Sequence, residues 1–168
     1  MNNTQESTGD YIKMYNDPNN VVDAYVDGSF RNGKASYAFV IIKNDEIIHK
    51  HYGVIHDREI NGGYQVGGEI QAVISAVKWC YDNKLKVKIS HDYTGLYKWV
   101  CDLFGGGRSW DAKKSYTINY RKFIEEHRHS IVCFQKVAAH TGDKWNEYVD
   151  GLAKSAYNSS ANTKHPRD

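Results

Sequence analysis

The chain has 168 residues, 40% of them hydrophobic and 25% charged, and its net charge at pH 7 is only +2. This length suits one domain with its own core and is too short for two. No run of about 18 apolar residues is present, so we expect no transmembrane helix, and the polar N-terminus indicates no signal peptide. The three cysteines lie in apolar patterns without Cys-x-x-Cys spacing, so we expect reduced core thiols in a cytoplasmic protein and no zinc site.

Both ends of the chain are polar and aperiodic. Residues 1–20 are expected to form a mobile arm and residues 158–168 a disordered tail. Residues 21–157 should form the folded domain. It starts with three strand-like runs joined by short turns, which predicts an antiparallel meander. These runs cover residues 21–30, 35–43 and 46–55.

Strands and helices alternate in the rest of the domain. A glycine-rich loop over residues 61–68 precedes a helix that the apolar spacing predicts from residue 70 to about residue 83. Further strands are expected at 87–92 and 131–137, and further helices at about 94–104, 118–129 and 145–156. This order predicts an α/β fold with a five-stranded mixed sheet, three antiparallel strands followed by parallel ones, and helices on both faces.

Four acids stand at the ends or edges of these elements. Asp27 closes the first strand, Glu69 opens the first long helix, and Asp92 ends a short strand. Asp150 lies on the last helix beside its apolar stripe. Taken singly, such acids are often turn residues, helix caps, partners of a helix dipole or solvated side chains. Acids at the edge of a buried face are costly unless paired, however, and clustered carboxylates suit Mg²⁺ or Mn²⁺. Two such ions about 3.5–4 Å apart are a common apparatus for cutting phosphodiesters.

Four segments carry a resemblance to a known family. They are Val-Asp-Gly-Ser at 26–29, Gly-Gly-Glu-Ile-Gln-Ala-Val at 67–73, Ser-His-Asp-Tyr at 90–93 and Ala-His-Thr-Gly-Asp-Lys-Trp-Asn-Glu-Tyr-Val-Asp at 139–150. With the order of elements, they resemble ribonuclease H of type 1, in the form of a stand-alone, bacterial-like domain, over about residues 21–157. The resemblance implies a ribonuclease H-like fold and an endoribonuclease that cuts the RNA strand of RNA/DNA hybrids. It also implies two Mg²⁺ ions, replaceable by Mn²⁺, and products with 5′-phosphate and 3′-hydroxyl ends.

The resemblance assigns the catalytic and metal-binding roles. Asp27 would bridge both ions, Asp150 would help to hold one, and Glu69 with Asp92 would hold the other. His140 would act as a proton shuttle or product-release group in a flexible loop, a task that suits the pKa of histidine. The alternative for His140 is a loop histidine without a role.

Substrate recognition requires groups that distinguish a 2′-hydroxyl from a deoxyribose. Gly28, Ser29 and Phe30 are expected to let the backbone approach the RNA strand. Asn61, Gln65 and Tyr64 are expected to contact the minor groove, and Gln65 stands where family members often have an asparagine.

Two further features bear on substrate binding. Trp99 either lies against a DNA sugar, as its counterpart in the family does, or packs in the core. A glycine-rich loop at 105–116 replaces the basic protrusion of some relatives. Its cations, Arg108, Lys113 and Lys114, are expected to contact phosphates.

Three other functions remain possible from the sequence. They are another nuclease of the same superfamily, a hybrid- or RNA-binding module without activity, and the ribonuclease H part of a reverse transcriptase. The first strand has Asp27-Gly28-Ser29 where a proofreading exonuclease has Asp-x-Glu, which argues against that nuclease. An intact set of four acids argues against a mere binding module. We therefore expect a hybrid-specific endoribonuclease that acts as a monomer and has no membrane partner.

Overall fold

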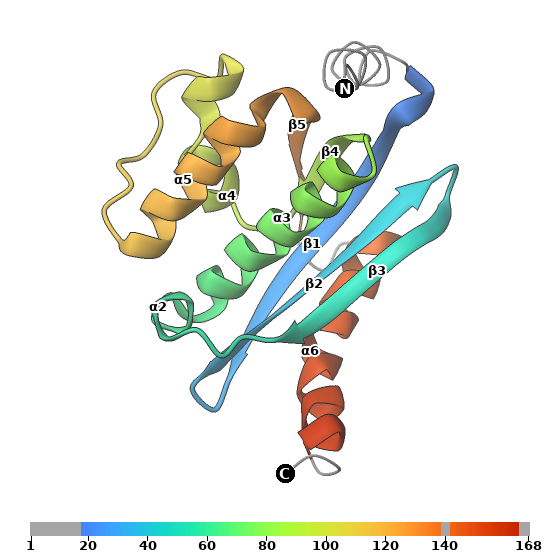
Figure 1. The fold of residues 1–168 in the computed structure, drawn as a ribbon, viewed down its shortest axis with the longest axis vertical. Coiled ribbons are helices and arrows are strands. Elements are labelled where there is room, and N and C mark those ends of the chain that lie inside the picture. The colour runs from blue at the N-terminus through green and yellow to red at the C-terminus, as the bar shows by residue number, and fades with distance from the viewer. Residues whose placement is uncertain (1–17, 139–141, 165–168) are drawn as a thin grey trace, which may run out of the picture.

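A five-stranded mixed sheet forms the centre of the molecule (Figure 1). The computed structural model describes residues 18–138 and 142–164, with side chains up to residue 158. The strands lie in the order β3-β2-β1-β4-β5, which confirms the expected α/β sheet. They are β1 (Val21–Arg31), β2 (Lys34–Lys43), β3 (Glu46–Val54), β4 (Lys86–His91) and β5 (Ile131–Lys136).

The pairing of β1 creates an opening in the sheet. β1 is antiparallel to β2 as far as Arg31, but its parallel pairing with β4 ends at Tyr25 and Ser90. The two parallel strands therefore separate just before Asp27 and Asp92. In open α/β sheets, ligands bind outside the carboxyl ends of the strands at such a point.

Helices cover both faces of the sheet, as expected (Figure 1). Val22, Ala24 and Val26 of β1 belong to the core on the α3 side, whereas Ala38 and Val40 of β2 pack with α6. This alternation follows from the two-residue period of a strand. The helices are α2 (Arg58–Asn61), α3 (Tyr64–Asp82), α4 (Gly95–Lys98), α5 (Ser115–His127) and α6 (Lys144–Lys164), with 3₁₀ turns at Pro18–Asn20, Cys101–Phe104 and Arg128–Ser130.

Several helix predictions were wrong in their bounds. The first long helix begins at Tyr64 and not near residue 70, so Glu69 lies inside α3 and does not open it. The helix expected over 94–104 is broken after Lys98, because Val100 leaves the helical conformation at φ −133°. The loop at 105–116 ends two residues early, since α5 starts at Ser115.

The ends of the chain also differ from the prediction. Residues 158–164 continue α6, so the disordered tail is wrong for this stretch. Residues 18–20 form a 3₁₀ turn, while residues 1–17 and 165–168 lie outside the described residues. Cys80 and Cys101 are buried free thiols, as predicted, and Cys133 is free and half-buried. Within the described ranges, no helix has the length and apolar character needed to cross a bilayer.

Close packing at glycines accounts for the start of α3 at Tyr64, before the predicted start near residue 70. A Cβ on Gly68 would collide with the carbonyl oxygen of Ser36 on β2, and a Cβ on Gly28 would collide with the backbone nitrogen of Glu69. A Cβ on Gly67 would collide with the carbonyl oxygen of Ile60 in α2. The glycine-rich stretch is thus the first part of α3, where backbone packs directly on backbone.

We predict that Gly68→Ala lowers the free energy of unfolding by about 2–3 kcal/mol, because the added methyl group must displace a strand carbonyl. Gly151→Ala is the matched control, since this helical position in α6 has open space around a Cβ. There the alanine should raise stability by about 0.5–1 kcal/mol through helix propensity alone. Urea unfolding measures both, and equal effects of the two substitutions would contradict the packing argument.

Candidate active site

Three carboxylates meet where β1 and β4 separate. Asp27 lies on β1, Glu69 is in the second turn of α3, and Asp92 directly follows β4. One carboxylate oxygen from each lies within 4.8 Å of the other two. A cavity of about 310 Å³ opens over them, and Asp150 on α6 lines the same cavity. The fold therefore gathers all four predicted acids around one space.

Two of these carboxylates are almost completely buried. Asp27 is 2% exposed and Glu69 is 1% exposed. The backbone nitrogen of Gly28 donates to Oδ1 of Asp27 over 2.9 Å. Neither carboxylate oxygen of Glu69 has a hydrogen-bond partner. A buried ionised group without a partner is costly, so these oxygens are suited to a ligand that brings positive charge.

The electrostatic strain is visible in the pKa values. Burial first, and then the negative charge of Asp92, raise the pKa of Asp27 to about 7, although its contact with Glu69 acts in the opposite direction. Burial and the charge of Asp27 raise the pKa of Glu69 well above its usual range. Protons therefore take the place of positive charge in this site at neutral pH, and a divalent cation would displace them. The all-oxygen donor set fits Mg²⁺ or Mn²⁺.

Asp150 stands slightly apart from the other three acids. It is not in the 4.8 Å group, and its Oδ2 accepts a hydrogen bond from Nζ of Lys154 over 3.0 Å. The position of α6 comes from the packing of Val149 and Ala153 on β2, with a hydrogen bond of 2.6 Å from Ser36 Oγ to the carbonyl oxygen of Ala153. Asp150 is thus held in the cavity wall by the helix and oriented by Lys154.

Two residues predicted to contact substrate have structural roles. The missing side chain of Gly28 makes room for α3, and Gly28 is buried at this contact. Asn61 accepts a hydrogen bond from Ala35 N at Oδ1 over 2.8 Å and donates from Nδ2 to the carbonyl oxygen of Ile55 over 2.9 Å. Its amide therefore ties α2 to the strands, and its contact with the minor groove stays a prediction.

Other predicted contacts lie at or near the surface. Gln65 is exposed and lines the acidic cavity, and Ser29 and Phe30 are half-buried near the end of β1. Trp99 is half-buried against the core, with its ring centroid 6.1 Å from Tyr93 and 5.8 Å from Trp110. Core packing therefore accounts for much of the Trp99 side chain.

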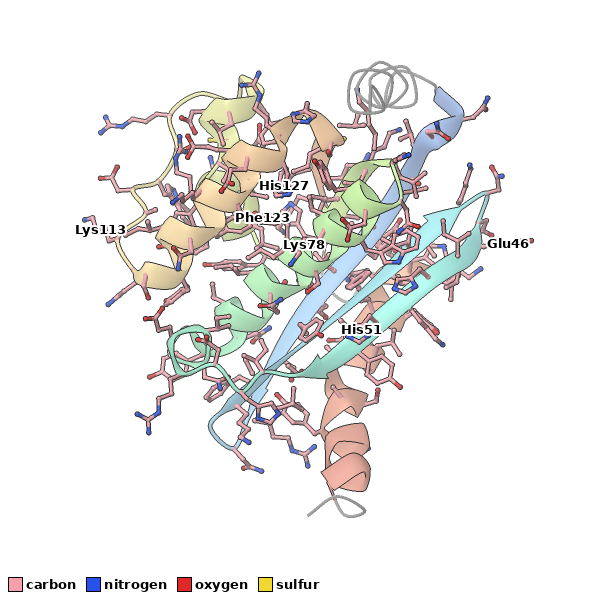
Figure 2. All side chains as sticks on the ribbon, viewed as in Figure 1. Glu46, His51, Lys78, Lys113, Phe123 and His127 are labelled. Atoms are coloured by element: carbon pink, nitrogen blue, oxygen red, sulfur yellow. The ribbon has the colours of Figure 1, made fainter. Side chains whose placement is uncertain are left out.

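The loop before α5 is exposed and anchored at its base. Asp102 pairs with Arg121 through two hydrogen bonds of 2.7 and 2.9 Å. Arg108, Lys113 and Lys114 all have exposed side chains, and Figure 2 shows Lys113 pointing outward from the loop. These three cations are accessible, as a phosphate contact requires.

Some cavity residues were missed by the sequence analysis. Val66 and Tyr93 line the acidic cavity beside Gln65 and Asp92, their chain neighbours. Adjacency to a predicted site residue was the available signal for both. His140 lies outside the described residues. His91 is 1% exposed, and burial lowers its pKa to about 4, so this histidine has a structural role.

The sequence model of the RNase H family matches residues 19–158. The chain belongs to the RNase H family. The protein is accordingly a ribonuclease H. A comparison with curated proteins found no significant match.

Solved structures show the same fold. Ribonuclease H1 from the archaeon Halobacterium salinarum is 21% identical, with a TM-score of 0.63 over 83% of this chain and 98% of that chain. LC11-RNase H1, isolated from compost and crystallised with an RNA/DNA hybrid, is 17% identical, with a TM-score of 0.58 over 81% of this chain and 99% of that chain. A foamy viral protease-reverse transcriptase is 19% identical, with a TM-score of 0.59 over 80% of this chain and 92% of that chain.

The raised pKa of Asp27 predicts how stability depends on pH in EDTA. Above the ordinary aspartate pKa of 3.8, the folded protein keeps a proton that the unfolded chain has released, so stability falls as pH rises toward about 7. The asparagine in Asp27→Asn cannot ionise. The free energy of unfolding of this variant, relative to that of the wild type, should therefore increase by on the order of 2–4 kcal/mol between pH 4 and pH 8.

Urea unfolding across this pH range measures the effect. The exposed Asp82 offers a control, because Asp82→Asn should keep the wild-type pH profile. Mg²⁺ at pH 8 should stabilise the wild type more than Asp27→Asn. If the free energy of unfolding of Asp27→Asn and of the wild type changed with pH in the same way, the pKa of Asp27 would not be raised in the folded protein.

Proposed function

We propose that this ribonuclease H is an endonuclease that hydrolyses the RNA strand of RNA/DNA hybrids. Two divalent cations, Mg²⁺ or Mn²⁺, would serve the reaction, and the products would have 5′-phosphate and 3′-hydroxyl ends. The observation that carries this proposal is the group of Asp27, Glu69 and Asp92 oxygens within 4.8 Å, in which both Glu69 oxygens lack a partner. The hybrid bound by LC11-RNase H1, a protein of the same fold, supports the substrate class.

Asp27 is the central ligand in this proposal. Its pKa responds to Glu69, Asp92 and Asp150, so its carboxylate is the one that interacts with each of the other acids. Glu69 and Asp92 would hold a cation on one side of Asp27, and Asp150 would help to hold another. Bound cations in such a site lower the pKa of an attacking water and neutralise charge that develops on the phosphate and the leaving oxygen.

The remaining groups would control geometry and access. Lys154 would orient Asp150 before a cation is bound, and its ammonium group would be released when the carboxylate becomes a ligand. Gln65, at the cavity wall, can both donate and accept hydrogen bonds and would contact base edges in the minor groove. His140 is proposed to move a proton or assist product release. Residues 21–157 would suffice as the catalytic domain, acting as a monomer.

Hybrid cleavage should require Mg²⁺ or Mn²⁺, and Ca²⁺ should not replace them, because Ca²⁺ adopts looser and higher coordination. Asp27→Asn should lower the cleavage rate by more than about 100-fold, since even the neighbours of metal ligands contribute about 10–100-fold. Cleavage of a labelled RNA/DNA hybrid in each metal and in EDTA measures both effects. Duplex RNA, duplex DNA and single-stranded RNA serve as substrate controls.

Asp82→Asn provides the matched control, because it removes one exposed carboxylate at the far end of α3 and should keep full activity. Full hybrid cleavage by Asp27→Asn, or turnover in EDTA, would refute the metal assignment. Cleavage of a duplex other than the hybrid at an equal rate would refute the substrate class and leave the metal site standing.

Replacing Arg108, Lys113 and Lys114 together by glutamine should raise KM and leave kcat unchanged. Each cation that contacts a phosphate contributes about 0.7–0.9 to the slope of log affinity against log salt, so the slope should fall by up to about 2–3. Steady-state kinetics from 50 to 200 mM salt provide the measurement.

A second triple variant distinguishes the loss of contacts from the loop from the general effect of removing three positive charges. Lys78, Lys84 and Arg128 are exposed and lie outside the loop, so their replacement by glutamine removes the same charge. This variant should keep a salt slope close to that of the wild type. If both triple variants lose affinity equally, the loop is not a specific binding surface.

A further inference from the structure

Tyr64 is the most exposed of the described large hydrophobic side chains. Its side chain and backbone are 65% exposed, compared with 48% for Ile118 and 47% for Trp110. It is the first residue of α3, directly before Gln65 and Val66, which line the acidic cavity. A large aromatic ring therefore stands in solvent beside the site.

The backbone of Tyr64 is also in an unfavourable conformation. Its φ is +54°, in the left-handed region that destabilises L-residues. Asn32, Asn44 and Asp45 share this region in tight turns, where such residues are common. Lys84 shares it just beyond the C-terminal end of α3, where left-handed residues often end helices. Tyr64 has no such role at the start of a helix.

One side of the Tyr64 ring has protein support. Phe30 lies with its ring centroid 5.0 Å away and its plane at 84°, an edge-to-face arrangement. Phe30 is three residues beyond Asp27 on β1, so the aromatic pair and the acidic cavity share the same two elements, β1 and α3. The preceding residue, Gly63, is packed against the ring of Tyr116 at the start of α5, which holds the segment in place. The exposed part of the Tyr64 ring is thus presented from a supported base.

We propose that Tyr64 is a substrate-binding residue whose ring packs against a sugar of the bound hybrid, in the minor groove next to the scissile phosphate. Strained backbone conformations persist where the surrounding structure enforces them and often serve a functional site. The bases of a duplex are stacked on one another, so an aromatic ring beside an intact groove meets sugars and base edges. Such a contact is insensitive to base sequence, in contrast to a hydrogen bond to a base. This inference rests on the proposed function, because it takes the hybrid as the ligand.

Three substitutions of Tyr64 separate binding from folding. Tyr64→Ala should weaken hybrid binding by about 5–50-fold, within the range for loss of an aromatic contact to nucleic acid, and Tyr64→Phe should bind within about 2-fold of the wild type. Tyr64→Gly should weaken binding as Tyr64→Ala does. It should also raise the urea midpoint of unfolding by about 0.5 M, because glycine adopts positive φ without strain. A residue that serves only the fold would not lose affinity while gaining stability.

Binding is measured by fluorescence anisotropy of a labelled hybrid, with every Tyr64 variant in the full-length Asp27→Asn protein to prevent cleavage. KM and kcat are measured with Asp27 intact, where KM should rise and kcat should stay unchanged. Two hybrids of unrelated sequence should give the same loss. Lys84→Gly is the matched control at the other end of α3, since it relieves the same strain and should leave Kd within about 3-fold.

The outcomes distinguish this inference from the proposed function. If the wild type neither binds nor cuts the hybrid, both are overturned. If the wild type binds and cuts it but Tyr64→Ala and Tyr64→Gly bind as tightly, only the inference is overturned. An equal loss in Tyr64→Phe would assign the contact to the hydroxyl group and overturn the packing of the ring against a sugar.

Discussion

The close contact between the backbones of α3 and β1 is the constraint on which the site depends. Gly28 and Gly68 leave no room for a Cβ at this contact, and it places Glu69 beside Asp27. A larger residue at either position would push the helix away from the sheet and separate the two carboxylates. The requirement for glycine is therefore a requirement of the active site as well as of the core.

This contact has an electrostatic consequence. It buries two acids side by side, with Asp92 close to both, so the pKa values of Asp27 and Glu69 rise. The site therefore opposes folding at neutral pH unless protons or cations neutralise it, and the apolar core on both faces of the sheet offsets that cost. The same repulsion that destabilises the protein without metal provides the affinity for divalent cations.

The surface around the site combines fixed and adaptable groups. Asp150 approaches from the opposite face of the sheet, on a helix that packs on β2. Its surface ion pair with Lys154 leaves its carboxylate able to change partners. Gln65 and Val66 form part of the cavity wall at the start of α3, and the exposed Tyr64 directly precedes them. The metal-binding acids thus lie on rigid elements, and the groups available for substrate binding lie at the edge of the site. Such an arrangement allows substrate contacts to change without disturbing the catalytic geometry.

Local patterns in the sequence determined the strands, the mixed sheet and the identity of the four acids, because strand alternation, turn residues and helical spacing are short-range signals. They also indicated the family through segments around Asp27, Glu69, Asp92 and Asp150. Only the tertiary structure decided what distant residues do to one another. Glycines at 67 and 68 that predicted a loop belong to a helix, because the partners that require them, Ile60 and Ser36, lie 7 and 32 residues earlier in the chain.

The hydrogen-bond partners and packing roles of individual residues could not be read from the sequence either. Asn61 has the chemistry of a groove contact, but its amide is bonded to backbone groups of Ala35 and Ile55. Gly28 was expected to contact substrate, and only the structure shows that it also serves the contact with α3. The sequence by itself determined which groups were available for chemistry. The packing of α3 and α6 on the sheet decided which of them meet, because contact between distant residues depends on backbone geometry that no local pattern encodes.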